Sequence, residues 1–332
     1  MPTLAVDPRS PDPAAIRRAA GTLRRGGLVA FPTETVYGLG ANALDPEAVA
    51  RIFAAKGRPS YNPLIVHLAD ADAARALAAE WSAAAERLAE RFWPGPLTLV
   101  VPRRAAVPDA VTAGLPSVAL RVPAHPVAQA LLREAGIPVA APSANRSTEV
   151  SPTTAAHVER SLGGRVALIL DGGPTPVGIE STVVGLAGTV PTLLRPGTVS
   201  IEELRDAVGP VVLPSHGPGG TGARPSPGML DRHYAPRAAL RAAGRDALVE
   251  ELRDRSGTGG RTAVLSLGGA PNLPAADVVA MPRDAREYAA RLYATLHRLD
   301  DEGFERILVE LPPDTPEWAG VRDRLRRASH PG

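Results

Sequence analysis

Short apolar runs alternate with longer amphipathic stretches along residues 1–210. The runs have the length of buried strands, and the stretches between them are long enough to form helices. This alternation is typical of an α/β domain, in which helices cover a sheet. We expect strands at 28–31, 64–68, 97–101, 118–122, 139–141, 166–170, 182–186 and 192–194, and helices near 71–92, 125–135 and 153–162.

Capping residues mark two further helices. Asp12 and Asp45 are each followed by proline, so a carboxylate can accept from the free amides of a first turn that tolerates the proline. Gly26 and Gly57 stand where these helices should end, because glycine accepts the left-handed exit.

The composition changes between Pro214 and Pro236, where glycine, proline and serine replace any apolar period. This stretch is longer than an ordinary connection and predicts an interdomain linker. The α/β pattern then resumes with strands near 262–267 and 306–311 and a helix at 284–299. We therefore predict a first domain at 1–212, a linker at 213–238 and a smaller domain at 239–332.

Composition narrows the possible chemistry. The 332 residues are 44% apolar, which is enough for two cores of ordinary size. No run approaches the roughly 18 apolar residues of a membrane span, and the first residues do not resemble a signal peptide. We therefore expect a cytoplasmic location and no membrane partner. The absence of cysteine excludes disulfides and thiolate chemistry.

The charged residues single out one lysine. The formal net charge is only +2, so charge alone does not indicate nucleic-acid binding. Lys56 is the only lysine among 37 basic residues, and all the others are arginine. Lysine is a compact ammonium with a shiftable pKa, whereas arginine is a planar fork, so a site that needs the first resists the second. Chance survival in an arginine-rich composition is the alternative.

Polar residues gather where predicted strands end, which is where open α/β sheets bind ligands. One group follows the strand at 28–31 with Thr33, Glu34, Thr35 and Tyr37. Another runs from Lys56 through Arg58 and Asn62 to His67. A third contains Ser143, Asn145 and Ser151, and we expect Ser151 to cap the next helix. The fourth contains Ser117, Arg121, Glu180, Ser181 and Arg195.

Each group taken alone has an ordinary structural interpretation, such as a capped turn, a basic helix end or a satisfied histidine. Together they offer guanidinium groups for anions and hydroxyls beside a helix start that could hold phosphate. The sequence has no GxxxxGK[ST] loop, no GxGxxG after a strand, no GxSxG and no HExxH. If ATP binds, it binds without a P-loop.

The ordered motifs resemble those of one known family. The pair Lys56-x-Arg58 and Ser143-x-Asn145 is framed by FPTETVYGLGANA, YNPLIVHL, WPGPLTLV, PVAAPSAN, IESTVV and LLRPG. This combination closely resembles the YrdC-like threonylcarbamoyl-AMP synthases. The later SPGMLDRHYAP and the extra domain resemble the long, two-domain form. The resemblance implies an open twisted mixed sheet with flanking helices, followed by a smaller Rossmann-like α/β domain.

The resemblance also implies a reaction and residue roles. L-threonine, bicarbonate and ATP would give L-threonylcarbamoyladenylate and pyrophosphate. A separate transferase complex would then modify the adenosine beside the tRNA anticodon. The catalytic set would be Lys56, Arg58, Ser143 and Asn145. Threonine would be held by Thr35, His67, Arg121, Ala141 and Ser181, and ATP by Arg58, Asn62, Ser117, Ser143, Ser151, Arg195 and Tyr234 of the linker.

Two expectations follow from this chemistry. Mg²⁺ should accompany ATP and be held mainly by the phosphates, because no dedicated carboxylate pair is evident. Closure of the linker, including Tyr234, would exclude water from hydrolysable intermediates, the alternative being a passive tether.

Other activities stay open on the sequence alone. A dihydroxybutanone-phosphate synthase should show clustered acidic metal ligands in its first loop, where this chain has only Glu34. A carbamoyl-adenylate-forming enzyme normally carries zinc-finger cysteines within a longer chain. A non-enzymatic RNA-binding module would need broad phosphate contacts and steep salt dependence.

Overall fold

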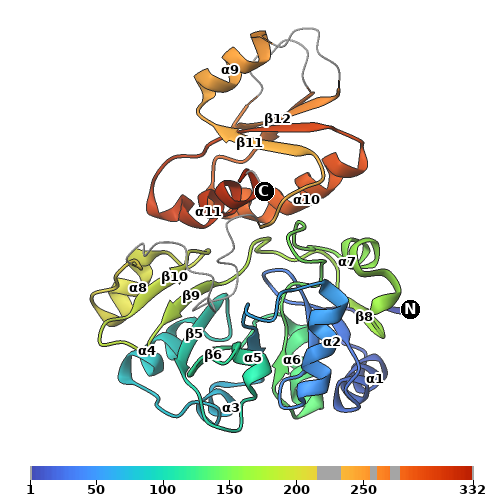
Figure 1. Ribbon diagram of the computed structural model, residues 1–332, viewed down its shortest axis with the longest axis vertical. Helices are drawn as coiled ribbons and strands as arrows, with labels where there is room; N and C mark the ends of the chain where they lie inside the picture. Colours follow the sequence, from blue (N-terminus) through green and yellow to red (C-terminus); the bar gives the residue numbers. More distant parts are fainter. Residues whose placement is uncertain (1, 215–232, 255–259, 270–276, 331–332) are drawn as a thin grey trace.

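A computed structural model of the chain describes residues 2–214, 233–254, 260–269 and 277–330 (Figure 1). Two sheets organise these residues. The first has ten strands in the order β1-β8-β2-β3-β7-β4-β6-β5-β9-β10, and the second has four in the order β11-β14-β12-β13. Most of the predicted linker, residues 215–232, lies outside the described residues.

The first sheet is mixed. β2 pairs antiparallel with β3 and parallel with β8, while β4 pairs parallel with β6 and antiparallel with β7. Its strands are β1 (Thr3–Ala5), β2 (Val29–Pro32), β3 (Tyr37–Asn42), β4 (Ile65–His67), β5 (Leu97–Pro102), β6 (Ser117–Arg121), β7 (Val139–Ala140), β8 (Leu168–Asp171), β9 (Thr182–Gly185) and β10 (Thr192–Arg195). Every strand expected in residues 1–210 is present, but β1 and β3 were not predicted.

β3 was missed because the sequence around it reads as a turn rich in polar residues. Its glycines make the strand look like a loop, yet Gly40 lies where a Cβ would come within 2.8 Å of Phe31 and 2.9 Å of Val139. Close packing of β3 against its neighbours therefore requires a residue without a side chain.

Helices cover both faces of the first sheet. They are α1 (Pro13–Arg24), α2 (Pro46–Lys56), α3 (Ala71–Arg75), α4 (Ala83–Phe92), α5 (Asp109–Thr112), α6 (Pro126–Ala135), α7 (Ala155–Leu162) and α8 (Ile201–Val208). Val29 and Phe31 of β2 pack in one core cluster with α1 and α6. Ala30, between them on the same strand, packs in another cluster with α2, α4 and α7. Alternate residues of a strand thus supply two cores.

The expectation of one helix over 71–92 is wrong, because the stretch forms α3 and α4 with an irregular segment between them. The hydroxyl of Ser82 accepts from the amide of Ala85 and starts α4. The amide of Ala79 bonds to the carbonyl of Pro102, so the intervening residues are tied to β5 instead of continuing the helix.

The second sheet is parallel throughout its described pairs. It consists of β11 (Ala239–Ala243), β12 (Thr262–Leu267), β13 (Asp277–Met281) and β14 (Arg306–Glu310), with helices α9 (Arg245–Asp254), α10 (Ala285–Asp301) and α11 (Ala319–Ala328). The sequence predicted β12, β14 and α10 but not the others.

The C-terminal part rests on the first sheet through α10 and α11, which lie between the two sheets (Figure 1). One core cluster joins the two parts. It contains Val36, Val150 and Ile179 from loops of the first part together with Tyr288, Leu292 and Val321. Among the described residues, no helix has the length and apolar character needed to cross a lipid bilayer.

Candidate active site

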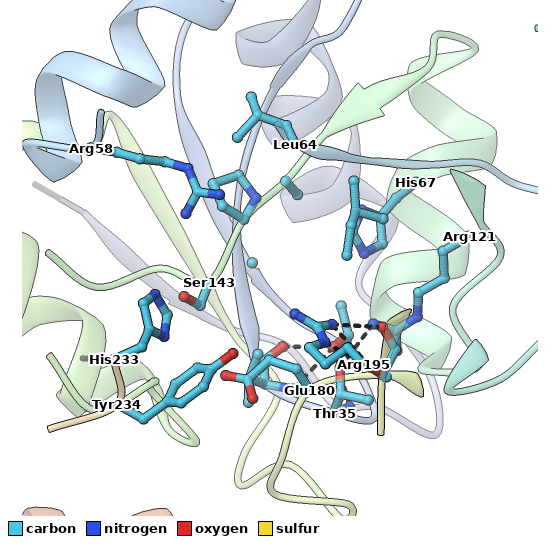
Figure 2. Close-up of a pocket in the computed structure, with 17 residues that line it drawn as sticks. Thr35, Arg58, Leu64, His67, Arg121, Ser143, Glu180, Arg195, His233 and Tyr234 are labelled. Atoms are coloured by element: carbon cyan, nitrogen blue, oxygen red, sulfur yellow. Dashed lines mark hydrogen bonds between the residues drawn. The ribbon is translucent and has the colours of Figure 1, made fainter. Parts of the chain in front are cut away.

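A pocket of about 530 Å³, part of it open to solvent, lies where several strand ends meet the last residues of the predicted linker. Figure 2 shows Arg58, Ser143 and Tyr234 on one side of it, and His67 and Arg121 on the other. The predicted site residues that line it are Thr35, Arg58, His67, Arg121, Ala141, Ser143, Ser181, Arg195 and Tyr234. These residues span 200 positions of the chain, so the fold brings together groups that the sequence separates widely.

One side of the cavity is built on the parallel strands β4 and β6. His67 and Arg121 end these strands and are register partners. The guanidinium of Arg121 donates to Thr35 Oγ1 at 3.0 Å and to Glu34 Oε1 at 2.6 Å. Thr35 Oγ1 also lies 2.8 Å from Thr33 Oγ1. A buried cation is thus fixed beside two hydroxyls, an arrangement suited to a small polar anion.

His67 is neutral in this setting. Its side chain is buried, and Nδ1 has no hydrogen-bond partner among the described residues. Burial, followed by the charge of Arg121, lowers the pKa of His67 to about 3. A neutral imidazole with a vacant ring nitrogen can accept from or donate to a bound polar group without adding a second positive charge.

Arg58 enters from the loop after α2. Its Nε and NH2 groups donate to the carbonyl oxygens of Asn62 at 3.2 Å and Pro63 at 2.9 Å, which fixes the direction of the side chain. Burial lowers the pKa of Arg58 to about 10, so it stays a cation at neutral pH. The side-chain amide of Asn62 is buried without a partner among the described residues, but it does not line the cavity.

Lys56 does not line the cavity either. Its Nζ donates to the main-chain carbonyl oxygens of Ser143, at 2.6 Å, and of Asn145. Asn145 in turn donates through Nδ2 to the carbonyl of Glu149 at 2.8 Å. Burial, and next the charge of Arg58, lower the pKa of Lys56 well below its ordinary value. The lysine and the asparagine therefore hold the Ser143 loop in place from behind.

Ser181 directly precedes β9, and Arg195 ends the neighbouring strand β10. Arg195 donates through Nε and NH2 to the carbonyl of Ser181 at 3.1 and 3.0 Å, and NH2 also lies 3.2 Å from Ser181 Oγ. Ser181 Oγ is 2.8 Å from Thr98 Oγ1. Arg121 and Arg195 line the same cavity, so this cavity can hold two anionic groups.

Tyr234 is the described linker residue that lines the cavity along with His233. It is fully buried and has a left-handed backbone conformation with φ of 62°. Its ring stacks on Tyr293 of α10 with centroids 5.8 Å apart. The hydroxyl has no partner among the described residues, and burial raises the pKa of Tyr234, so the group is a protonated donor.

Two residues predicted to contact the nucleotide, Ser117 and Ser151, are not among those that line the cavity. Ser117 begins β6, whereas Arg121 ends it, which separates their Cα atoms by roughly 13 Å at the rise of a strand. Ser151 does not cap a helix, since Thr154 caps α7. The hydroxyl of Ser151 instead donates to Glu180 Oε1 at 2.5 Å and so supports this carboxylate, which lines the cavity.

Glu180 belongs to the fourth polar group of the sequence but was given no role there, and it lines the cavity. Burial raises its pKa, but the guanidinium groups of Arg324 and Arg195 outweigh this and leave the pKa below its usual value. Glu180 is therefore an ionised carboxylate. Its position directly before Ser181 was an available signal, whereas Arg324, one arginine of many near the chain end, gave none.

The described residues contain no group of three or more acidic or histidine side chains that could hold a metal ion. The carboxylates of Glu34 and Glu180 at the cavity already form ion pairs, with Arg121 and Arg324 respectively. A dedicated protein cage for Mg²⁺ does not fit these residues. A Mg²⁺ ion that arrives as part of its phosphate substrate is compatible with them.

Comparison with known families accounts for both parts of the chain. Residues 21–197 match the family described as "Telomere recombination", and residues 199–330 match the one described as "Threonylcarbamoyl-AMP synthase, C-terminal domain". The two matches meet near the end of β10, where the first sheet ends.

Similar proteins cover nearly the whole length. A protein of Pyrococcus abyssi named threonylcarbamoyl-AMP synthase is 44% identical over 95% of this chain and 94% of its own. One of Bacillus subtilis with the same name is also 44% identical, over 97% and 95%. The crystal structure of P. abyssi Sua5 complexed with L-threonine superposes with a TM-score of 0.91, at 42% identity over 99% of this chain and 98% of that one. The chain belongs to the threonylcarbamoyl-AMP synthase family, in its two-domain form.

Proposed function

We propose that this protein forms L-threonylcarbamoyladenylate from L-threonine, bicarbonate and ATP, with release of pyrophosphate. The observation that carries the proposal is the single cavity in which three buried arginines, Arg58, Arg121 and Arg195, face hydroxyl groups and a neutral histidine. Such a site can gather several anionic reactants without a covalent nucleophile. The names of its relatives and the threonine complex of P. abyssi Sua5 support the same reaction.

We assign threonine to the side built by β4 and β6. Arg121, already oriented by Glu34, can pair with the carboxylate of an amino acid. The hydroxyls of Thr35 and Ser181 can bond to its polar atoms. His67, held neutral by burial, can accept a hydrogen bond from the amine of threonine.

We assign ATP to the side formed by Arg58, Ser143, Arg195 and Tyr234. Two guanidinium groups there can neutralise the charge that builds on the α-phosphate and on departing pyrophosphate. The hydroxyls of Ser143 and Tyr234 are further donors. Lys56 contributes from behind, by fixing the loop on which Ser143 lies.

The reaction has two bond-forming steps. First, the neutral amine nitrogen of threonine bonds to the carbon of bicarbonate, and water leaves to give a carbamate. An oxygen of the carbamate then bonds to the α-phosphorus of ATP, and the bond to the β-phosphate oxygen breaks, so that the electron pair departs with pyrophosphate. Holding the reactants in one cavity supplies much of the rate, since positioning can be worth about 7–11 kcal/mol.

Mg²⁺ enters this proposal as a companion of ATP, held mainly by the phosphates, where it would offset their charge. The product then requires a separate threonylcarbamoyl transferase that delivers the group to tRNA. The cytoplasm, where ATP and tRNA meet, is the expected site of action. A direct contact with tRNA is not needed for the reaction itself.

One assay tests the proposal. Purified full-length protein is supplied with ATP and Mg²⁺, and pyrophosphate release is measured with both L-threonine and bicarbonate, with either alone, and with neither. We expect release only when both are present, with a nucleotide product that contains threonine. Release without threonine would point to another adenylate-forming reaction, and no release under any condition would refute the proposal.

A further inference from the structure

Arg324 lies on α11, in the C-terminal part, but its side chain is fully buried against the active-site wall. Its Nε donates to Glu180 Oε2 at 2.7 Å, and its NH2 donates to the carbonyl of Glu180 at 3.2 Å. Its NH1 donates to the carbonyl of Pro196 at 3.1 Å. One guanidinium thus ties together the residues next to Ser181 and Arg195, both of which line the cavity.

Arg324 also supports Tyr234. The guanidinium carbon is 5.1 Å from the centre of the Tyr234 ring, within the range of a cation–π contact. Tyr293 of α10 stacks on the same ring and donates to Glu180 Oε2 at 3.1 Å. Two helices of the C-terminal part therefore act on the same two cavity residues, Glu180 and Tyr234.

The charges around Arg324 are balanced, which keeps its orientation fixed. Asp323 Oδ2 accepts from its NH1 at 2.8 Å, and Glu180 accepts from its Nε. Asp323 is itself held by Arg326 and Arg327 of the same helix. A guanidinium buried without such partners would be costly, so the network constrains the cation to one geometry.

Arg324 acts mainly on the ATP side of the cavity, because it contacts Tyr234 and the carbonyl of Pro196, the residue next to Arg195. Glu180, Pro196 and Tyr234 border the region that we assign to ATP. Arg324 contacts none of Thr35, His67 and Arg121, and it reaches the threonine side only through Glu180, which directly precedes Ser181. Arg324 is itself not a cavity-lining residue, so it can act on the reaction only through its neighbours.

We propose that Arg324 is a positioning residue for ATP, through which the C-terminal domain completes the nucleotide half of the active site. This inference rests on the proposed function for the identity of the ligand. It gives the second domain a role inside the chemistry, because an enzyme lacking α11 would lose the group that fixes Glu180 and Tyr234. Threonine binding would be set by the first domain alone.

The decisive variant is Arg324→Lys in the full chain. Lysine keeps the positive charge but lacks the planar fork that reaches Glu180, Pro196 and Asp323 together. We expect the KM for ATP to rise by about tenfold or more, the scale of one lost hydrogen bond to a charged group. The affinity for L-threonine, measured by calorimetry without ATP, should stay within about twofold of the wild type, since threonine contacts are independent of this network.

Arg322→Lys is the matched control. Arg322 lies on the same helix but donates to the carbonyl of Pro312 and pairs with Asp314, away from the cavity. The Arg322→Lys variant should leave the KM for ATP and the affinity for L-threonine unchanged. If Arg324→Lys folds and keeps the wild-type KM for ATP, or if it weakens ATP and threonine equally, Arg324 has no specific role for the nucleotide and the inference is wrong.

A second variant guards against a misfolded lysine mutant. Tyr293→Phe removes only the hydroxyl that donates to Glu180, and it should raise the KM for ATP by about threefold, in line with one neutral donor. No rise would overturn the inference. Calorimetry with ATP separates this outcome from failure of the proposed function. If the wild type binds ATP but makes no threonylcarbamoyl product, the proposed reaction is refuted, and the ratio of the ATP affinities of the variant and the wild type still tests Arg324. If the wild type binds no ATP, the proposed reaction and the role of Arg324 are both refuted.

Discussion

The Nζ of Lys56 lies 2.6 Å from the main-chain carbonyl oxygen of Ser143, a residue 87 positions further along the chain. The same Nζ donates to the carbonyl of Asn145. The only lysine of the protein thus braces the loop that presents Ser143 to the cavity. The lysine that the motif predicts as a catalytic cation therefore also anchors a neighbouring loop.

Replacing Lys56 with methionine tests this anchor. Methionine has a similar length but no donor, so the carbonyl oxygens of Ser143 and Asn145 lose the lysine as a partner. We expect the free energy of unfolding to fall by roughly 2–4 kcal/mol and kcat/KM for ATP to fall by at least about tenfold. Urea unfolding and pyrophosphate release measure the two effects. Arg51→Lys, on the exposed side of the same helix, should change the free energy of unfolding by no more than about 0.5 kcal/mol. It should change kcat/KM for ATP by no more than the factor that corresponds to the same energy.

The ion pair between Arg121 and Glu34 supports the threonine side. Its atoms are 2.6 Å apart, and the side chains are only 4% and 8% exposed. Glu34→Gln leaves the buried guanidinium without a counter-charge, so we expect a loss of about 3–5 kcal/mol in stability and a higher KM for threonine. Glu302→Gln removes the exposed pair with Arg298 and should cost less than about 1 kcal/mol. Equal losses in the two variants would contradict the structure.

Burial of His67 predicts a pH dependence of stability. Its pKa falls from 6.5 in the unfolded chain to about 3 in the folded protein. The unfolded chain therefore binds an extra proton once the pH drops below about 6.5, and the folded protein loses stability down to about pH 3. As the pH falls through that window, the free energy of unfolding of the wild type should decrease, relative to that of His67→Gln, by up to about 1.4 kcal/mol per pH unit.

Urea unfolding of both proteins between pH 4 and 8 checks this prediction. Above about pH 7 the difference between them should not vary with pH, because the histidine is neutral in both states. A constant difference down to pH 4 would show that the imidazole is exposed to solvent in the folded protein.

The hydroxyl of Tyr234 can be tested separately from its ring. Tyr234→Phe removes a buried hydroxyl that has no partner among the described residues, so stability should be nearly unchanged. The KM for ATP should rise by about threefold to tenfold if this hydroxyl donates to the nucleotide. Tyr288→Phe is the control, because its hydroxyl is also buried and without a described partner, but it does not line the cavity.

Tyr234→Ala removes the ring that packs between Tyr293 and Arg324. We expect a larger loss of ATP affinity than in the phenylalanine variant. Unchanged affinity and turnover would favour a linker that acts only as a tether.

The strand ends at His67, Arg121 and Arg195 could be placed from the sequence because apolar runs are readable and parallel strands bring their carboxyl ends together. β3 could not be placed, because glycines and polar residues hide a strand whose packing needs small residues. Closeness in sequence can also mislead. Ser117 is only four residues before Arg121, yet the two residues lie at opposite ends of β6 because the strand is extended.

The sequence by itself determined the α/β class, the strands at 64–68 and 118–122, and the motif order that resembles a threonylcarbamoyl-AMP synthase, because these depend on local periodicity and residue type. Only the tertiary structure decided that Lys56 donates to the loop that carries Ser143, that Ser151 supports Glu180, and that Arg324 reaches the active site from the second domain. The reason is physical. The partner of a buried polar group is chosen by the packing of distant segments, and no local pattern in the chain records that choice.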